Sequence, residues 1–140
     1  MTVRTNKDNH EKLLGIFLTL VVTQVGAAGW EKVVDTPSGA TYVHTSSIVK
    51  DGYYVTAWIL YDRKKPFPDF ANGEKLYLST KTRIKYNCNN ETWQFISTTN
   101  FVGNMGEGSI TGSRDFVAEP FHSLPDRYAR KVFDYLCAKP

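Results

Sequence analysis

The chain has 140 residues, which is enough for one domain with a modest core and too few for two. Its content of 41% hydrophobic and 22% charged residues excludes a disordered chain, and 14% aromatic residues favour β structure. The formal net charge of +3 is too small to indicate a nucleic-acid-binding protein, a class in which basic residues are numerous and clustered.

The first 28 residues have the three-part pattern of a secretory signal peptide. Basic residues precede the charge-free apolar run at 13–22, and small residues follow it. This run is shorter than the about 20 residues that a membrane-spanning helix needs. A buried N-terminal helix and a retained membrane anchor are the alternatives. We predict cleavage after Ala27 or Ala28, a single domain over 29–140, no stable membrane span after cleavage, and a periplasmic or secreted location.

The mature chain begins with segments that are typical of antiparallel strands. Residues 30–36 and 40–45 form a predicted pair around a turn at 37–39, and a longer strand covers 53–61 after a turn at 50–52. Because apolar residues occur on both faces of this longer strand, we predict that it is central in the sheet. The next segment, 63–73, contains two prolines and a glycine and is predicted to be a loop.

The strand predicted over 76–88 shows the period of two that places alternate side chains on opposite faces. Its even-numbered positions are mostly apolar and include Ile84, Tyr86 and Cys88, whereas its odd-numbered positions are mostly polar. A tight turn at 89–90 leads into a further strand over 91–103, and one or two short strands follow before residue 120.

The C-terminal segment is predicted to be an amphipathic helix. Ser123 and Asp126 have the spacing of a capping box, and Pro125 is compatible with the first turn. One apolar stripe contains Ala129, Val132, Phe133, Leu136 and Cys137. We therefore predict an α+β fold of about six antiparallel strands in a twisted, half-open sheet, with this helix packed on one face.

Cys88 and Cys137, the two cysteines of the chain, both face the predicted core, one from the sheet and one from the helix. An exported protein meets an oxidising environment, in which such thiols pair. We predict a disulfide between them that ties the helix to the sheet. The alternatives are two buried free thiols or a catalytic or metal-binding cysteine, but no histidine lies nearby in the sequence to complete a metal site.

The sequence contains no pattern that indicates catalysis. His44, His122, Asp35 and Asp115 lack the spacing of metal ligands. The glycines within 103–108 are not followed by the lysine and hydroxyl residue of a phosphate-binding loop. We predict that the chain is not an enzyme and that it has no cofactor and no metal site.

A row of basic side chains is the strongest candidate for contact with a partner. Lys81, Arg83 and Lys85 occupy odd-numbered positions of their strand and are predicted to face away from the core, with Tyr77 beside them. This row is a solvated strand face, a charged edge that blocks aggregation, or a surface that binds a polyanion or an acidic protein. Basic residues that would extend it, if their loop lies nearby, are Arg63, Lys64 and Lys65.

Three segments resemble the surface-adhesin protein E family of bacterial envelope proteins. They are TYVHTSSI at 41–48, RIKYNCNNETWQFISTTNFVGNMGEG at 83–108, and YARKVFDYLCA at 128–138. The resemblance implies a six-stranded antiparallel sheet with a C-terminal helix tied to it by the Cys88–Cys137 disulfide. It also implies an envelope-facing binding module that is able to form a homodimer, some relatives of which engage host matrix proteins.

These observations lead to two hypotheses about function. The first is an exported, non-enzymatic, adhesin-like module that binds a protein partner or host matrix protein through Lys81, Arg83 and Lys85. Members of the family can be lipid-anchored through a cysteine directly after the signal peptide; because 22–30 contains none, we favour a soluble periplasmic or secreted protein. The alternative is a periplasmic small-ligand-binding or hydrolytic protein whose pocket between helix and sheet is lined by Trp58, Tyr86 and Phe133.

Overall fold

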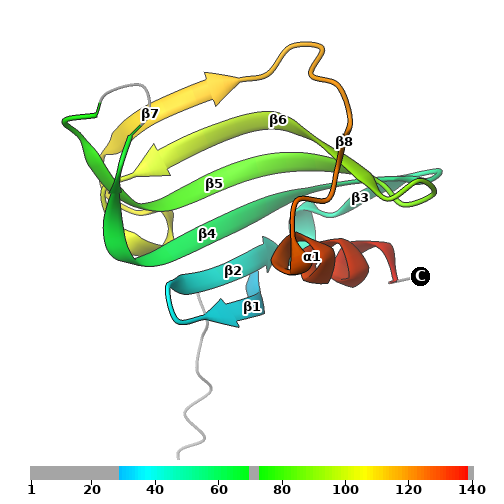
Figure 1. Cartoon of the computed structure of the whole chain (residues 1–140), viewed down its shortest axis with the longest axis horizontal. Helices are drawn as coiled ribbons and strands as arrows, with labels where there is room; N and C mark the ends of the chain where they lie inside the picture. Colours follow the sequence, from blue (N-terminus) through cyan, green and yellow to red (C-terminus); the bar gives the residue numbers. More distant parts are fainter. Residues whose placement is uncertain (1–28, 70–72, 139–140) are drawn as a thin grey trace, which may run out of the picture.

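A computed structural model describes residues 29–69 and 73–138, so the predicted signal peptide lies outside the described residues. Within them, one open antiparallel sheet has the strand order β1-β2-β4-β5-β6-β7, with the short strands β3 and β8 paired to β4 and β6. Helix α1 lies against one face of this sheet (Figure 1), and the predicted α+β fold is confirmed. The elements are β1 (Trp30–Thr36), β2 (Gly39–His44), η1 (Thr45–Ser47), β3 (Val49–Asp51), β4 (Tyr54–Pro68), β5 (Leu76–Asn87), β6 (Thr92–Phe101), η2 (Asn104–Gly106), β7 (Ile110–Asp115), β8 (His122–Ser123) and α1 (Arg127–Cys137).

The register between β4 and β5 defines the two faces of the sheet. Ile59 pairs with Thr82, and Trp58 pairs with Arg83. Directly opposite residues of antiparallel strands point to the same face. Ile59 is buried in the core together with residues of α1, so its face is the one that the helix covers. We call it the helix face, and we call the face that carries Trp58 and Arg83 the outer face.

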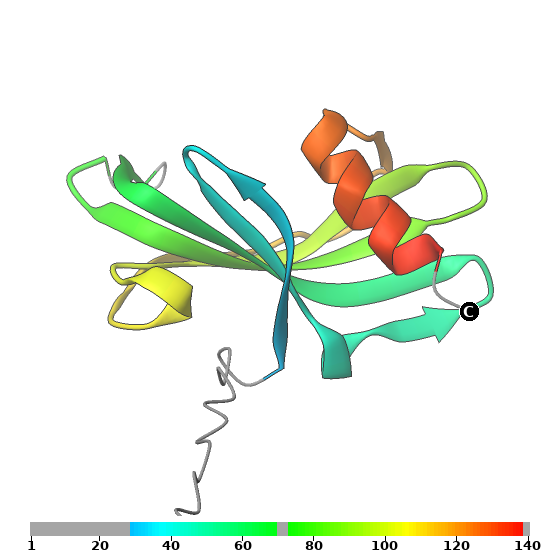
Figure 2. The same ribbon diagram turned by 90° about the horizontal axis from the view of Figure 1, so that it is seen from below.

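The core lies between α1 and the sheet, on the helix face. The predicted apolar stripe of α1 contributes Val132, Phe133 and Leu136, all of which are buried. Phe133 meets Tyr86 of β5 edge to face, with 6.1 Å between the ring centroids. Figure 2 shows that α1 lies over one end of the sheet only, beyond the β1–β2 hairpin. The other end of the helix face therefore has no helix against it.

Helix α1 begins later than the sequence pattern indicates. Asp126 is its N-cap, and its carboxylate accepts hydrogen bonds of 2.8 Å from the backbone amides of Tyr128 and Ala129. The prediction that Ser123 caps the helix is wrong, because Ser123 belongs to β8 and pairs with Thr92. Its carbonyl accepts a hydrogen bond from the indole of Trp93.

Strand β4 continues through part of the segment that was predicted to be a loop. It extends to Pro68 and pairs with β5 through Phe67 and Pro68, after an irregularity that begins at Asp62. On the other side of β4, the pairing with β2 ends at Arg63. Proline, which has no backbone N–H to donate, is tolerated here because, among the described residues, no strand pairs with this part of β4 on the β2 side. The loop prediction is therefore wrong for the residues up to Pro68.

The exposure of side chains at the start of β5, beside the same irregularity, differs from the predicted alternation. The predicted alternation is confirmed at Thr82, Ile84 and Tyr86, which are buried. It is wrong at the start of the strand, where Leu76 is 50% exposed and Tyr77 is buried. The pairing register breaks between Asp62 and Phe67 of the neighbouring strand, so the surroundings of Leu76 and Tyr77 differ from those of a regular sheet.

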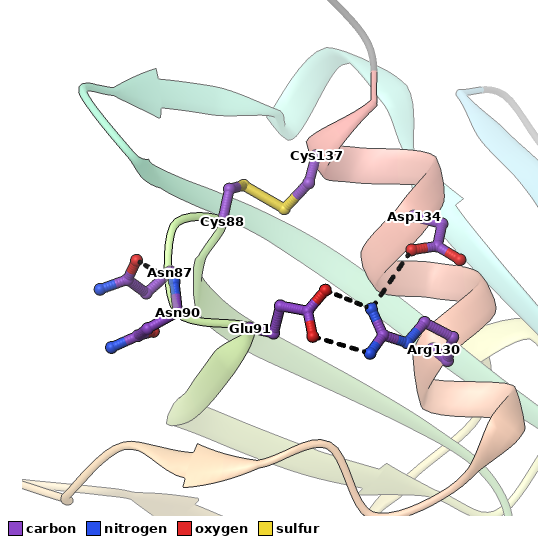
Figure 3. Close-up of polar contacts among 7 residues, drawn as sticks. All are labelled: Asn87, Cys88, Asn90, Glu91, Arg130, Asp134 and Cys137. Carbon is purple, nitrogen blue, oxygen red and sulfur yellow. Dashed lines mark hydrogen bonds and ion pairs between the residues drawn. A yellow bond between two sulfur atoms is a disulfide. The ribbon is translucent and has the colours of Figure 1, made fainter.

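The predicted disulfide between Cys88 and Cys137 is confirmed. Its sulfurs are 2.11 Å apart, and it joins the turn after β5 to the last turn of α1 (Figure 3). An ion pair lies beside it, in which the terminal guanidinium nitrogens Nη1 and Nη2 of Arg130 donate to the two carboxylate oxygens of Glu91 at 2.8 and 2.9 Å. Asp134, one turn further along α1, lies 3.7 Å from the same guanidinium. The β5–β6 turn is thus held to the helix by one covalent and one ionic contact.

The Glu91–Arg130 ion pair should make stability depend on acid pH. The hydrogen bond and the charge of Arg130 lower the pKa of Glu91 from its usual 4.5. Because the pKa is lower in the folded chain, ionised Glu91 stabilises the fold above the unfolded pKa, and this contribution is lost as pH falls through the folded pKa. Between about pH 6 and about pH 3, Glu91→Gln should lose less stability than the wild type in thermal unfolding. Equal losses in both proteins would contradict the assignment, and Glu107→Gln is the control at another exposed glutamate.

Candidate functional site

The three basic residues singled out from the sequence lie together on the outer face. Arg83 pairs with Trp58 of β4, Lys81 with Leu60 and Lys85 with Thr56. Arg83 is exposed, and the other two are half-buried. The row is therefore continuous along β5 and faces away from α1, as its odd numbering predicts.

Aromatic rings hold the two lysines of this row. The Lys81 ammonium lies 5.9 Å from the ring centroid of Trp30 and 5.1 Å from that of Phe101. The Lys85 ammonium lies 4.4 Å from the ring centroid of Tyr54. These distances are in the range of cation–π contacts, which restrict the side chains without neutralising their charge. The two ammonium groups are thereby positioned before any partner arrives.

A groove of about 400 Å³ lies beside Lys81 on the outer face and is lined by Trp30, His44, Ser46, Ser47 and Trp58. The rings of Trp30 and His44 meet edge to face, 4.9 Å apart. The Ser47 hydroxyl donates to the carbonyl of His44 at 2.7 Å and accepts from the amide of Trp58 at 2.9 Å. These hydrogen bonds hold η1 against β4, so the groove has a fixed wall.

The groove brings together residues that sequence reasoning missed. Trp30 and His44 are opposite each other in the β1–β2 pair and share a face. The alternation of side chains in β1 and β2 indicates which of their residues share a face. It does not indicate which of the two strands pairs with β4. We refer to Lys81, Arg83 and Lys85, with Trp30, His44, Tyr54 and Trp58, as the basic–aromatic surface.

The glycine-rich segment after β6 packs on the other end of the outer face. The amide of Gly106 donates to the Ser79 hydroxyl at 2.8 Å, and the amide of Met105 donates to the Asp62 carboxylate at 2.8 Å. A Cβ atom on Gly106, where φ is +71°, would lie 2.2 Å from Lys81 Cε. Glycine is favoured here because it adopts this positive φ without strain, whereas the flexible end of the Lys81 side chain could move away from a Cβ atom.

The basic–aromatic surface carries unbalanced positive charge. Across the part of the chain that the structure describes, no carboxylate lies within ion-pair distance of Lys81, Arg83 or Lys85. The carboxylate of Asp62, on β4, accepts hydrogen bonds from the Asn104 side chain and the amide of Met105. An acidic partner would therefore meet three cations whose charge is not already neutralised.

Other residues that were predicted near the row lie elsewhere. The Arg63 guanidinium stacks 5.3 Å from the ring centroid of Tyr77 and does not extend the row. Tyr77 itself is buried, so its predicted exposure on the outer face is wrong. Lys64 and Lys65 are exposed, and Lys64 lines a hollow with Lys32 rather than with Lys81.

The scattered histidines and aspartates do not gather into a metal site. His122 binds the nearby Glu119, and His44 contacts Trp30 and Ser46. Within 29–69 and 73–138, no group of three or more His, Cys, Asp or Glu side chains is placed to hold a metal ion. In the same residues, no helix has the length and apolar character to cross a membrane.

The three aromatic residues of the alternative pocket do not share a site. Tyr86 and Phe133 are buried against each other in the core, whereas Trp58 lies on the outer face. Burial, and secondarily the charge of Asp126, raises the pKa of Tyr61 to about 12, and burial raises the pKa of Tyr86 well above its usual value. Both phenols of the helix face are therefore protonated at neutral pH and are not poised to act as bases.

Comparison with known proteins places this arrangement in a family. The model of the family described as surface-adhesin protein E matches residues 30–138. A crystal structure of Haemophilus influenzae protein E, form II, superposes with a TM-score of 0.63 at 18% identity, over 81% of this chain and 90% of that one. Protein E from non-typeable H. influenzae gives 0.60 at 18% identity, over 81% and 78%. A search of functionally characterised sequences returned no match. Because the family model covers more than half of the chain, the chain belongs to the surface-adhesin protein E family.

Proposed function

We propose that this chain is an exported, non-enzymatic, adhesin-like module that binds an acidic protein surface, such as that of a host matrix protein, through the basic–aromatic surface. Its family consists of surface adhesins, which supports an exported or surface location and a binding role. The signal peptide that the sequence predicts at 1–28 would direct this export. The resemblance also implies a homodimer, which light scattering of the mature chain would reveal.

The observation that carries the proposal is the row of three cations without acidic neighbours among the described residues. The ammonium groups of Lys81 and Lys85 are already held by aromatic rings, so little side-chain entropy is lost when a partner binds them. The adjoining groove offers Trp30 and Trp58, and tryptophan and arginine are the residue types that dominate binding energy at protein interfaces. Charge and aromatic surface together suit an acidic partner with an apolar side chain to insert.

The test is binding of the mature chain to a panel of immobilised matrix proteins. The variant Lys81→Ala/Arg83→Ala/Lys85→Ala should bind the captured partner at least about tenfold more weakly, since each exposed charge contact contributes up to about 1 kcal/mol. Raising the salt concentration should weaken the wild type more than this variant, because screening acts on the removed charges.

The matched control is Lys50→Ala/Lys64→Ala/Lys131→Ala, which removes the same net charge from exposed positions elsewhere. It should keep most of the wild-type affinity. If both triple variants bind equally well, or if both lose affinity equally, the basic–aromatic surface is not the binding site.

A further inference from the structure

The uncovered end of the helix face changes from apolar to polar side chains. Beneath α1, this face of β5 carries Ile84 and Tyr86, which are buried in the core. Toward the start of the same strand, this face carries Thr82, which pairs with Thr98 of β6, and then Thr80, which pairs with Asn100. The helix does not reach this part of the face (Figure 2). Hydroxyl and amide groups thus replace aliphatic ones where α1 no longer covers the sheet.

Hollows of about 250 and 320 Å³ adjoin on this part of the face. Both are lined by Thr98, Asn100 and Phe116. Arg63 lines one of them and Arg114 lines the other. We call this continuous depression the threonine trough. Its dimensions are at the small end of the range for small-ligand sites.

The polar groups of the trough are fixed by one another. The hydroxyls of Thr82 and Thr98 are 3.0 Å apart. The Thr80 hydroxyl donates to the Asn100 amide oxygen at 2.8 Å, and the Asn100 amide nitrogen donates to Asp69 at 2.9 Å. A hydroxyl has one donor and two acceptor sites, and an amide has four sites in all. These side chains are therefore pre-oriented, and the half-buried Thr80, Thr98 and Asn100 retain hydrogen-bonding capacity for a ligand, whereas Thr82 is buried behind them.

Aromatic rings and guanidinium groups form the walls. The rings of Phe95 and Phe116 stack with 5.2 Å between their centroids, and the Arg114 guanidinium lies 4.7 Å from the centroid of Phe116. The Arg63 guanidinium stacks on Tyr77, and its buried Nε has no hydrogen-bond partner among the described residues. Arg63 and Arg114 thus each bring a guanidinium group to one of the two hollows.

We propose that the threonine trough binds an acidic disaccharide. The C–H groups of sugar rings suit the apolar surface of Phe95 and Phe116 that their contacts with each other and with Arg114 leave uncovered, and sugar hydroxyls suit the fixed threonine and asparagine groups. A carboxylate suits Arg63 or Arg114, each of which lines one of the two hollows, because arginine binds a carboxylate in a bidentate geometry. Asp69 is the carboxylate that lines the trough, and it already accepts hydrogen bonds from Asn100 and Thr111. The trough lies on the face opposite the basic–aromatic surface, so its ligand and the protein partner are independent.

The test uses two disaccharides that differ in one acidic group: N-acetylglucosaminyl-N-acetylmuramic acid, which has a carboxylate, and di-N-acetylchitobiose, which has none. Both are titrated into the mature protein while the methyl resonances of its threonines are followed by NMR. The acidic disaccharide should shift Thr82 and Thr98 and bind about tenfold more tightly than the neutral one. Arg114→Gln should remove most of this preference, and Thr98→Val should weaken binding of both sugars.

Arg83→Gln, on the outer face, is the control. It should leave disaccharide binding unchanged and should weaken binding of the protein partner. The amide spectrum of each variant reports whether it is folded. Absence of threonine shifts with either sugar would overturn the proposal, as would equal affinity for the two. A short acidic peptide is the third titrant, and if it shifts the same threonines as strongly as the acidic sugar, the site is not a saccharide site.

Discussion

The double variant Cys88→Ala/Cys137→Ala should have a free energy of unfolding about 4 kcal/mol lower than that of the oxidised protein. The cysteines are 49 residues apart in sequence, so the disulfide closes a long loop and restricts the unfolded chain. Small domains are stable by only about 5–15 kcal/mol, which makes this a large share of the total. The neighbouring Glu91–Arg130 pair cannot replace the disulfide, because exposed ion pairs contribute little.

Urea unfolding followed by circular dichroism measures this difference. The expected result is a lower midpoint for the double variant and a similar lowering for the wild type in a reducing agent. Asn89→Ala, at an exposed position of the same turn, is the control and should stay close to the wild type. A loss below about 1 kcal/mol would contradict the view that the disulfide holds the helix to the sheet.

The second large effect is expected at the helix–sheet contact. Phe133→Ala should lower the free energy of unfolding by about 3–5 kcal/mol. Phe133 is 4% exposed and packs against Tyr86, so its removal leaves a cavity lined by the sheet and α1. The cost combines the loss of buried apolar surface with the cavity that remains.

Lys131→Ala is the matched control, since Lys131 is exposed on the opposite side of the same helix. It should change the unfolding free energy by less than about 0.5 kcal/mol. Equal stability of Phe133→Ala and Lys131→Ala would mean that α1 does not form the core with the sheet. Binding through the basic–aromatic surface should survive in any Phe133→Ala protein that is still folded, because that surface faces away from α1.

The parts of the fold that depend on local patterns could be predicted from the sequence. The stripe that contains Val132 and Leu136 gave the buried side of α1, and alternation in β5 put Cys88 on the same side of the sheet. Together they predicted the disulfide. Lys81, Arg83 and Lys85 were placed correctly for the same reason, since the register is regular along this part of β5.

The parts that depend on pairing between distant strands could not be predicted. Tyr77 is buried, next to the place where the pairing register of β4 breaks after Asp62, and no local pattern indicates that break. The groove beside Lys81 requires Trp30 and His44 to reach the neighbourhood of Trp58, which depends on β2 pairing with β4. The threonine trough was missed because the threonines in the sequence do not indicate which part of the helix face α1 leaves uncovered.

The surface used for binding is tested most directly by the indole NH resonances of the three tryptophans. Trp30 and Trp58 line the groove on the outer face, whereas the Trp93 indole binds the Ser123 carbonyl and its ring packs against Phe95. When the protein partner captured from the matrix-protein panel is added, the resonances of Trp30 and Trp58 should shift and that of Trp93 should not. A shift of Trp93 with unchanged Trp30 and Trp58 would contradict binding through the basic–aromatic surface.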